Sequence, residues 1–348
     1  MAPQPSPAAA LMKKSEGTRR DFLRTCIAGA AVLGSGGSME LLEAAGPNSA
    51  LAKSRVVIAR DPMLRGAGTT VDSQRVLNLL DHAMQALFDA DHPADPWKTL
   101  VRPGDKVGLK VNAIGGRAFS SNLQLVEAVC ERLQQAGVKA NDIVVWDRDT
   151  EELERAGFHV SIAPNHVQCF GTDRAGYEED LVTYGSAGSR LSKILTRSCN
   201  VLINMPLLKD HDGAGVSMAL KNMYGVIHNP NKYHPNGCNP YVADVNMLSD
   251  IRTKMRLTIC DATTAMYEGG PAYKPQYSWK NNALMVSRDP VALDYVGWQA
   301  IERKRAEKKL KTLEAEKRAP LYIATAADAQ HRLGTNDPRR IAVIEADR

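Results

Sequence analysis

The sequence predicts an α/β fold in which a mostly parallel sheet is flanked by helices. Short runs of apolar, β-branched residues alternate with segments whose apolar residues recur at helical spacing, which indicates strands joined through helices. The composition of the 348 residues, 44% hydrophobic and 24% charged, is that of a globular protein. We expect a single domain over residues 53–348, with long loops at the carboxyl ends of its strands.

The first half of this domain is expected to contain three strands and three helices. Strands are expected where apolar, β-branched residues cluster, at 54–60, 105–113 and 142–147, and helices where apolar residues recur three and four apart, at 73–88, 122–137 and 150–157. Gly137 and Gly157 close the last two helices, because glycine adopts the left-handed conformation of a helix end at little cost.

The second half supplies further strands and a long helix. Apolar runs predict strands at 200–206, 256–262 and 283–287. Asp289 followed by Pro290 has the order of an N-cap and a first helical residue, so a long helix begins there. Its far end, 302–318, is almost wholly charged, and we expect it to form a solvated helical projection.

The first 52 residues have the features of an export signal. "TRRDFLR", Thr18 to Arg24, has the paired arginines and the Phe-Leu of a twin-arginine signal, and a weakly apolar, glycine-rich run follows. That run is too short and too rich in glycine for a stable membrane span. Cleavage after Ala52 would make Lys53 the first residue of a periplasmic protein exported by the twin-arginine translocation machinery. The alternative is a disordered basic tail with a chance arginine pair.

The net charge of +5 is unevenly placed. Residues 1–52 and 302–318 together account for all of it, which leaves no general basic surface of the kind that nucleic-acid binding needs. We therefore expect no nucleic-acid partner.

Five cysteines follow residue 52, at positions 130, 169, 199, 238 and 260. Their number is odd and no two have C-x-x-C spacing, which argues against an iron–sulfur cluster or a zinc site built from cysteine alone. One or two disulfides can form in an oxidising compartment, but the sequence does not determine their pairing.

Ionisable and amide side chains follow five of the expected strands. Ligands of open α/β sheets bind at the carboxyl ends of the strands, so these side chains are expected to converge on one site. The groups that we expect there include Lys110, Asn112, Asp147, Lys209, His211, Asp261 and Gly270. Loops are polar in any case, which would explain about half of these residues without a site.

The segment 207–238 has the chemistry of an anion site. Gly213 and Gly215 precede an expected short helix, "VSMALKNMYGV", whose first N–H groups would point toward Lys209 and His211. Lys221 and Asn222 follow within that helix, and Lys110 is expected nearby. In this interpretation the lysines hold a carboxylate or phosphate. His211, with a carboxylate such as Asp261 beside it, then acts as general acid or base, so that His211, Lys209 and Asp261 are the candidate catalytic residues.

A metal site is the second interpretation of the same segment. Imidazole and carboxylate are ligands for zinc, nickel or iron, and the candidates are His211, His228, His234 and Cys238. The gaps between the histidines match no standard metal signature, and a histidine in such a loop is more often only a surface residue. Cys238 could also be a nucleophile, but no base can be assigned to it.

Several blocks resemble a known family. "VGLKVNAIGG", "VLINMPLLKDHDGAGVSMALKNMYGV", "LTICDATTAMYEGGP", "MVSRDPVALDYVGWQAI" and "LGTNDPRRIAVIE" are similar to successive blocks of the bacterial domain-of-unknown-function family 362, over about residues 54–345. The resemblance implies a fold and a site location, and no particular reaction. Some members carry a ferredoxin-like cysteine cluster, which this sequence lacks. The positions that match the polar signature are Lys110, Asn112, Lys209, His211, Lys221, Asn222, Asp261, Gly270, Asp289 and Asp294.

These observations lead to a functional expectation with two alternatives. The protein is expected to be an exported enzyme that acts on a small anionic substrate, or that uses a metal ion or metal-containing cofactor, in a polar Lys/His/Asp cleft. The first alternative is a periplasmic protein that binds a ligand or handles a cofactor in this cleft without turnover. The second is a structural partner that uses the charged helix end 302–318.

Overall fold

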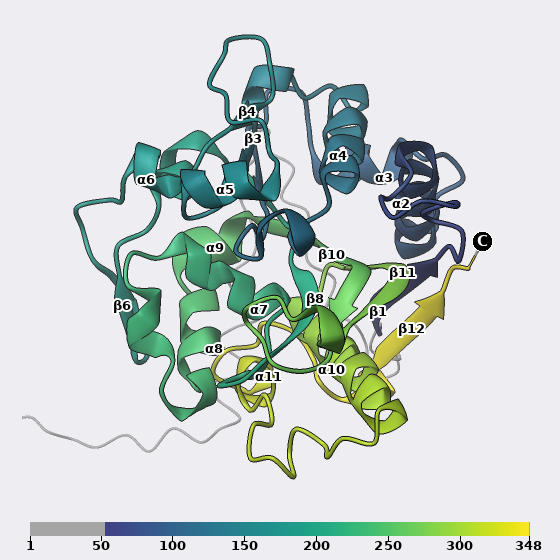
Figure 1. Ribbon diagram of the computed structural model, residues 1–348. Coiled ribbons are helices and arrows are strands. Elements are labelled where there is room, and N and C mark those ends of the chain that lie inside the picture. The colour runs from purple at the N-terminus through teal and green to yellow at the C-terminus, as the bar shows by residue number, and fades with distance from the viewer. Residues whose placement is uncertain (1–52, 348) are drawn as a thin grey trace, which may run out of the picture. The chain divides into compact units, whose positions relative to one another are not determined.

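The computed structural model describes residues 53–347 (Figure 1), so the signal predicted for residues 1–52 lies outside the described part. These residues form a mixed α/β domain with a large, mostly parallel sheet flanked by helices, which confirms the predicted fold class. The path of the sheet is β12-β1-β11-β10-β7-β2-β3-β4, with β8 paired to β10 and β9 paired to β8. Its strands are β1 Ser54–Arg60, β2 Val107–Lys110, β3 Ile143–Trp146, β4 Gln168–Cys169, β7 Val201–Asn204, β8 Leu207–His211, β9 Gly215–Val216, β10 Met255–Met266, β11 Ser278–Ser287 and β12 Ile341–Glu345.

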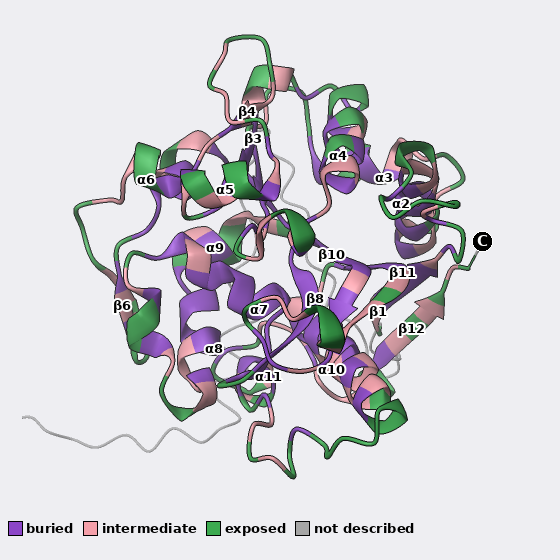
Figure 2. Cartoon of the chain, in the orientation of Figure 1, coloured by how far each residue is buried: buried purple, intermediate pink, exposed green. Residues whose placement is uncertain are grey.

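Helices cover both faces of the sheet. Alternate residues of β1 point to opposite faces, and Val56 and Val57 accordingly belong to two different hydrophobic clusters. Helices α2 and α4 cover the Val57 face, and α7 and α10 cover the other. Figure 2 shows the central strands as buried and outer helices such as α5 with an exposed side. The helices are α2 Ser73–Phe88, α3 Asp95–Leu100, α4 Leu123–Gln135, α5 Thr150–Ala156, α6 Thr172–Ala175, α7 Ala219–Asn222, α8 Tyr241–Asn246, α9 Ser249–Lys254, α10 Pro290–Glu307 and α11 Tyr322–Ala327.

None of the helices found over residues 53–347 is both long and apolar enough to cross a bilayer. A separate two-stranded hairpin, β5 Val182–Tyr184 with β6 Ala187–Ser189, lies within the long segment after α6.

The predicted strands are present, but three features of the sheet differ from expectation. Strand β11 lies between β1 and β10 and is antiparallel to both. Strand β12 was not among the predicted strands, and it pairs with β1 in parallel. No strand was predicted at residues 207–211, but they form β8, because β10 extends to Met266 and offers pairing partners to Leu207 and Lys209.

The long helix α10 ends earlier than predicted. It stops at Glu307, so a helical projection over 302–318 is wrong for the residues that follow. Arg305 is fully buried, and its guanidinium contacts the backbone oxygen of Lys311 and the carboxylate of Glu316. A buried guanidinium needs such partners, and the chain after α10 folds back to supply them.

Candidate functional site

A cavity of about 530 Å³ lies at the carboxyl ends of β2 and β3, beside β8 and α7. It is lined by most of the residues that the sequence indicated. These are Lys110, Asn112, Lys209, His211, Lys221, Asn222 and His234. We call this cavity the lysine pocket.

Strand β8 directs two of these side chains into the lysine pocket. Side chains two residues apart in a strand point to the same face, and Lys209 and His211 both line the cavity. Asp210, between them, instead accepts a hydrogen bond from the backbone N–H of Gly270 at 3.0 Å and forms an ion pair with Arg318 at 3.4 Å. Gly270 therefore supports β8 from outside the pocket.

Lys110 is held by a carboxylate. Its Nζ lies 2.6 Å from Oδ1 of Asp147, and both side chains are buried. The Nζ also donates a hydrogen bond to the backbone oxygen of Val111 at 2.8 Å, and Asp147 Oδ2 accepts one from Ala113 N at 2.8 Å. Separating the two groups would leave a buried charge without a partner, which is strongly unfavourable. Lys110 and Asp147 therefore stay paired in the pocket wall.

Lys209 and Lys221 form no ion pair with a carboxylate anywhere in the described residues. Lys209 Nζ donates to Asn112 Oδ1 at 3.2 Å. Lys221 Nζ lies 3.3 Å from Nε2 of His234 and 4.5 Å from the ring centre of Tyr224. Burial, reinforced by the nearby Lys221 charge, lowers the pKa of Lys209 to about 8. Burial also lowers the pKa of Lys221. The two ammonium groups thus have neutral partners only, which is the arrangement of a site for an anion.

His211 is a neutral hydrogen-bond donor in this geometry. Its Nδ1 accepts from the backbone N–H of Gly213 at 3.1 Å and of Ala214 at 3.2 Å, which places the ring proton on Nε2. Burial, followed by the Lys221 charge, lowers the pKa of His211 to about 2. The geometry therefore favours donation of a hydrogen bond from Nε2 over the general acid–base role that the sequence suggested.

His234 has the opposite arrangement. Its Nδ1 lies 3.1 Å from the backbone oxygen of Pro230, to which it donates, so that Nε2 is free to accept from Lys221. The rings of His211 and His234 stack with centroids 5.8 Å apart. The two histidines line the pocket, and Nδ1 of each ring is hydrogen-bonded to the backbone.

The predicted histidine and cysteine ligands do not meet at a single point. His228 is exposed and its ring packs on Tyr177. Cys238 is buried in the hydrophobic core, and burial raises its pKa. All five cysteines of the described part are buried and free of disulfides.

Within residues 53–347, the group that could hold a metal ion consists of carboxylates that the sequence did not single out as ligands. Asp210, Asp212 and Glu268 offer oxygens within 4.8 Å of one another. Arg318 already lies among them, 3.4 Å from Asp210 and 2.8 Å from Glu268. The positive guanidinium of Arg318 already neutralises part of the negative charge that would attract a metal ion to these carboxylates.

The anion site predicted at a helix start is not formed. Helix α7 begins only at Ala219, and the N–H groups of Ala219 and Leu220 donate to the carboxylate of Asp294 at 2.7 and 3.0 Å. The chain's own carboxylate therefore occupies the helix start, and burial raises the pKa of Asp294 to about 7. Gly213 lies in the turn between β8 and β9, and Gly215 is the first residue of β9, so neither glycine directly precedes the helix.

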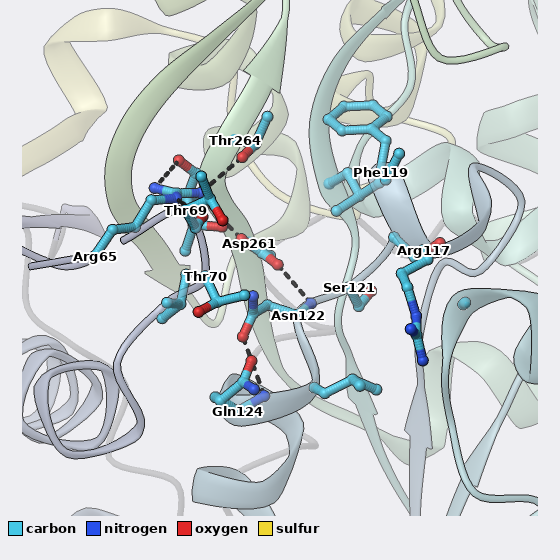
Figure 3. A pocket seen from close by; sticks show the side chains of 17 residues that line it. Arg65, Thr69, Thr70, Arg117, Phe119, Ser121, Asn122, Gln124, Asp261 and Thr264 are labelled. Atoms are coloured by element: carbon cyan, nitrogen blue, oxygen red, sulfur yellow. Dashed lines mark hydrogen bonds between the residues drawn. The ribbon is translucent and has the colours of Figure 1, made fainter. Parts of the chain in front are cut away.

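Asp261 does not accompany His211. It lines a second pocket (Figure 3), which has a volume of about 340 Å³. There it accepts hydrogen bonds from the backbone N–H of Asn122 at 2.7 Å and of Thr263 at 2.9 Å. The guanidinium of Arg65 lies on the same side of this pocket and bonds to Thr264. Asp261 thus anchors the start of α4, and the predicted His211–Asp261 partnership is wrong.

Sequence reasoning missed Gly225 as a residue of the site. A Cβ at this position would lie 2.8 Å from Nζ of Lys110 and 3.0 Å from Oδ1 of Asp147. A side chain at position 225 would force Lys110 or Asp147 to shift, so glycine allows the ion pair to approach this turn closely. Glu152, whose pKa is raised first by burial and then by Asp147, also lines the cavity. The sequence marks Gly225 only as the end of a helix.

Comparison with known proteins places the site within a family. No curated protein matches the chain closely enough to be a relative. Residues 107–299 match the sequence model of a family described as domain of unknown function (DUF362). The matched stretch runs from β2 into α10 and contains the lysine pocket, whereas β1 and the closing block with β12 lie outside it. Because the match covers more than half of the chain, this protein is a member of the DUF362 family.

Proposed function

We propose that this protein is an exported enzyme that binds a small anionic substrate between Lys209 and Lys221. The observation that supports this proposal is the burial of two ammonium groups without an acidic partner among the described residues. A buried charge is costly unless it is paired, and a carboxylate or phosphate of the substrate would supply the missing charge. The twin-arginine motif supports export.

The other groups of the pocket would orient the substrate. Asn112 links Lys209 to Asn222, since its Oδ1 accepts from Lys209 and its Nδ2 donates to Asn222 at 3.1 Å. Nε2–H of His211 would donate to an oxygen on which negative charge develops, as in an oxyanion site. Lys110 would maintain the wall together with Asp147 and would not bind substrate directly.

Calorimetric titration tests the binding step. The chain from residue 53 onward is titrated with phosphate, oxalate and pyruvate, and at least one of them is expected to bind. Lys221→Met should weaken binding about tenfold or more, because a hydrogen bond to a charged group contributes about 1.5–3 kcal/mol. Lys232→Met is the matched control, since Lys232 also lies over a tyrosine ring but outside the pocket. Equal affinity in wild type and Lys221→Met would remove the basis of the proposal.

The non-catalytic alternative uses the same pocket and is distinguished by turnover. The bound anion is incubated with the protein and its products are followed by NMR. An enzyme should lose turnover but keep most of its affinity when His211 is replaced by Asn, because the donor to the reacting oxygen is lost. Binding without any turnover in the wild type would make the protein a periplasmic ligand-binding protein.

A metal-containing cofactor is tested by elemental analysis of the exported protein. We expect less than one metal per chain, because Arg318 already holds the carboxylates of Asp210 and Glu268. The variants Asp212→Asn, His211→Ala and His234→Ala are measured alongside. Stoichiometric metal that is lost in any of them would replace the anion proposal by a metal-dependent one.

A further inference from the structure

Lys209 differs from the other two lysines of the pocket in what its amine contacts. Lys110 is paired with the Asp147 carboxylate at 2.6 Å, and this contact favours its charged form. Lys221 lies over the face of the Tyr224 ring, a position that also favours a cation. Among residues 53–347, the hydrogen-bond partner of the Lys209 amine is the amide oxygen of Asn112, at 3.2 Å.

The surroundings of Lys209 make its ammonium easier to deprotonate than that of an ordinary lysine. Its side chain is buried, and the charged groups that act on its amine are Lys221 from α7, Lys110 from β2, Asp147 after β3 and, from the other side of β8, Asp210. Of the two carboxylates, Asp147 is paired with Lys110 and Asp210 with Arg318. Burial and the neighbouring cations together bring the pKa of Lys209 to about 8. A buried amine next to another cation is the arrangement that activates lysine as a nucleophile.

We propose that Lys209 forms a covalent imine with the carbonyl group of an oxo acid whose carboxylate is held by Lys221. This inference rests on the proposed anion site and names the class of its substrate. The nitrogen of Lys209 forms a bond to the carbonyl carbon, and both amine hydrogens leave with the carbonyl oxygen as one molecule of water. No oxidant or reductant is consumed.

His211 is placed to assist this step. It lies two residues from Lys209 on the same face of β8, and its Nε2–H is free to donate to the oxygen that becomes hydroxyl and then water. The stacked ring of His234 holds the Lys221 ammonium through Nε2. The carbonyl and the carboxylate of a 2-oxo acid are adjacent, which matches a nucleophilic amine and an anion-binding ammonium within one pocket.

Reductive trapping tests the imine. The chain from residue 53 onward is incubated with pyruvate and borohydride, and intact mass and peptide mapping locate the adduct. We expect one reduced pyruvate adduct per chain, on Lys209. Lys209→Arg keeps a positive charge but cannot form the imine, and it should lose the adduct, whereas Lys232→Arg should keep it. Circular dichroism and melting curves show whether the variants are folded. Peptide mapping of the adduct on the wild-type protein locates the modified lysine without any variant.

The outcomes separate this inference from the proposed function. Calorimetric binding of pyruvate together with a Lys209 adduct supports both. Binding of pyruvate without any adduct, or with adducts spread over surface lysines, overturns the imine and leaves the anion site standing. If pyruvate, oxalate and phosphate all fail to bind and no adduct forms, both proposals fail.

Discussion

Lys209 and Lys221 are neighbours whose charges oppose each other, and this opposition can be measured. Each ammonium lacks an acidic partner in the described residues, and Lys221 is the cation that most strongly disfavours a charge on Lys209. Like charges in a poorly hydrated site shift protonation toward the neutral form. An anion that enters the pocket would relieve this repulsion.

We expect Lys221→Met to raise the pKa of Lys209 above the value of about 8 in the wild type. Loss of a neighbouring positive charge favours the protonated amine, so the titration midpoint should move to higher pH. NMR titration of the Lys209 side chain, assigned with Lys209→Arg, measures both midpoints. A wild-type midpoint near the ordinary lysine value of about 10.4 would contradict the electrostatic argument.

Gly225 offers a steric test of the pocket wall. In Gly225→Ala the new Cβ would lie 2.8 Å from Nζ of Lys110, so the ion pair with Asp147 must move. We expect a loss of about 1–3 kcal/mol in the free energy of unfolding, measured by urea denaturation. Gly68→Ala, whose nearest neighbour would be 3.4 Å away, is the control. A stability equal to that of the control would show that the wall is not tightly packed there.

The sequence predicted which residue types line the pocket better than it predicted their partners. Lys110, Lys209 and His211 were identified because polar side chains near strand ends converge in α/β sheets. The partnership of His211 with Asp261 failed because the two belong to different pockets, which residue spacing does not show. Nor could spacing show that Asp294 fills the helix start that an anion was expected to occupy.

At the scale of elements, His331 joins the chain after α11 to helix α8. Its Nε2 lies 3.0 Å from Oδ1 of Asp244 in α8, and its Nδ1 lies 2.9 Å from Oδ1 of Asp328, which follows α11. Burial alone would lower the pKa of His331, but the hydrogen bonds to Asp244 and Asp328 outweigh burial and raise it. Protonation of His331 therefore stabilises the contact between helix α8 and the chain that follows α11.

A raised histidine pKa predicts a definite dependence of stability on pH. The folded state binds the proton more tightly than the unfolded state, so the stabilisation is fully present below the unfolded pKa of about 6.5. It is lost as pH rises through the higher folded pKa. Urea denaturation between pH 5 and pH 9 should show this loss in the wild type and not in His331→Gln. The same slope in both proteins would contradict the role of His331.

Helices and strands were predicted from local residue patterns. The predictions that failed concern elements whose structure depends on contacts with distant parts of the chain. Helix α2 and strand β1 follow the expected bounds because their apolar periodicity is clear. Strand β8 was not predicted because its polar residues lack the apolar pattern of a strand. These residues form a strand by pairing with the end of β10. Helix α10 stops early because Arg305 requires buried partners from the segment that follows.

At the scale of the molecule, export is predicted from the N-terminal motif. Replacement of Arg19 and Arg20 by Lys should leave most of the protein in the cytoplasm of a host with a working twin-arginine pathway, because that pathway selects the arginine pair. Immunoblots of periplasmic and cytoplasmic fractions measure the distribution. Equal periplasmic amounts of both forms would exclude this route.

The α/β class could be predicted for the whole domain, whereas the strand order could not. Alternation of strands and helices is a local property that the sequence displays. The antiparallel insertion of β11 and the parallel pairing of β12 with β1 bring together residues far apart in the chain. These pairings determine which strand ends meet, and the lysine pocket depends on them.

The most direct test of the anion site is an anomalous diffraction measurement on crystals of the domain soaked in iodide. We expect a strong peak in the lysine pocket, in contact with Nζ of Lys209 and Nζ of Lys221, that disappears in crystals of Lys221→Met. Iodide peaks only on the outer surface, with none between these two lysines, would contradict it.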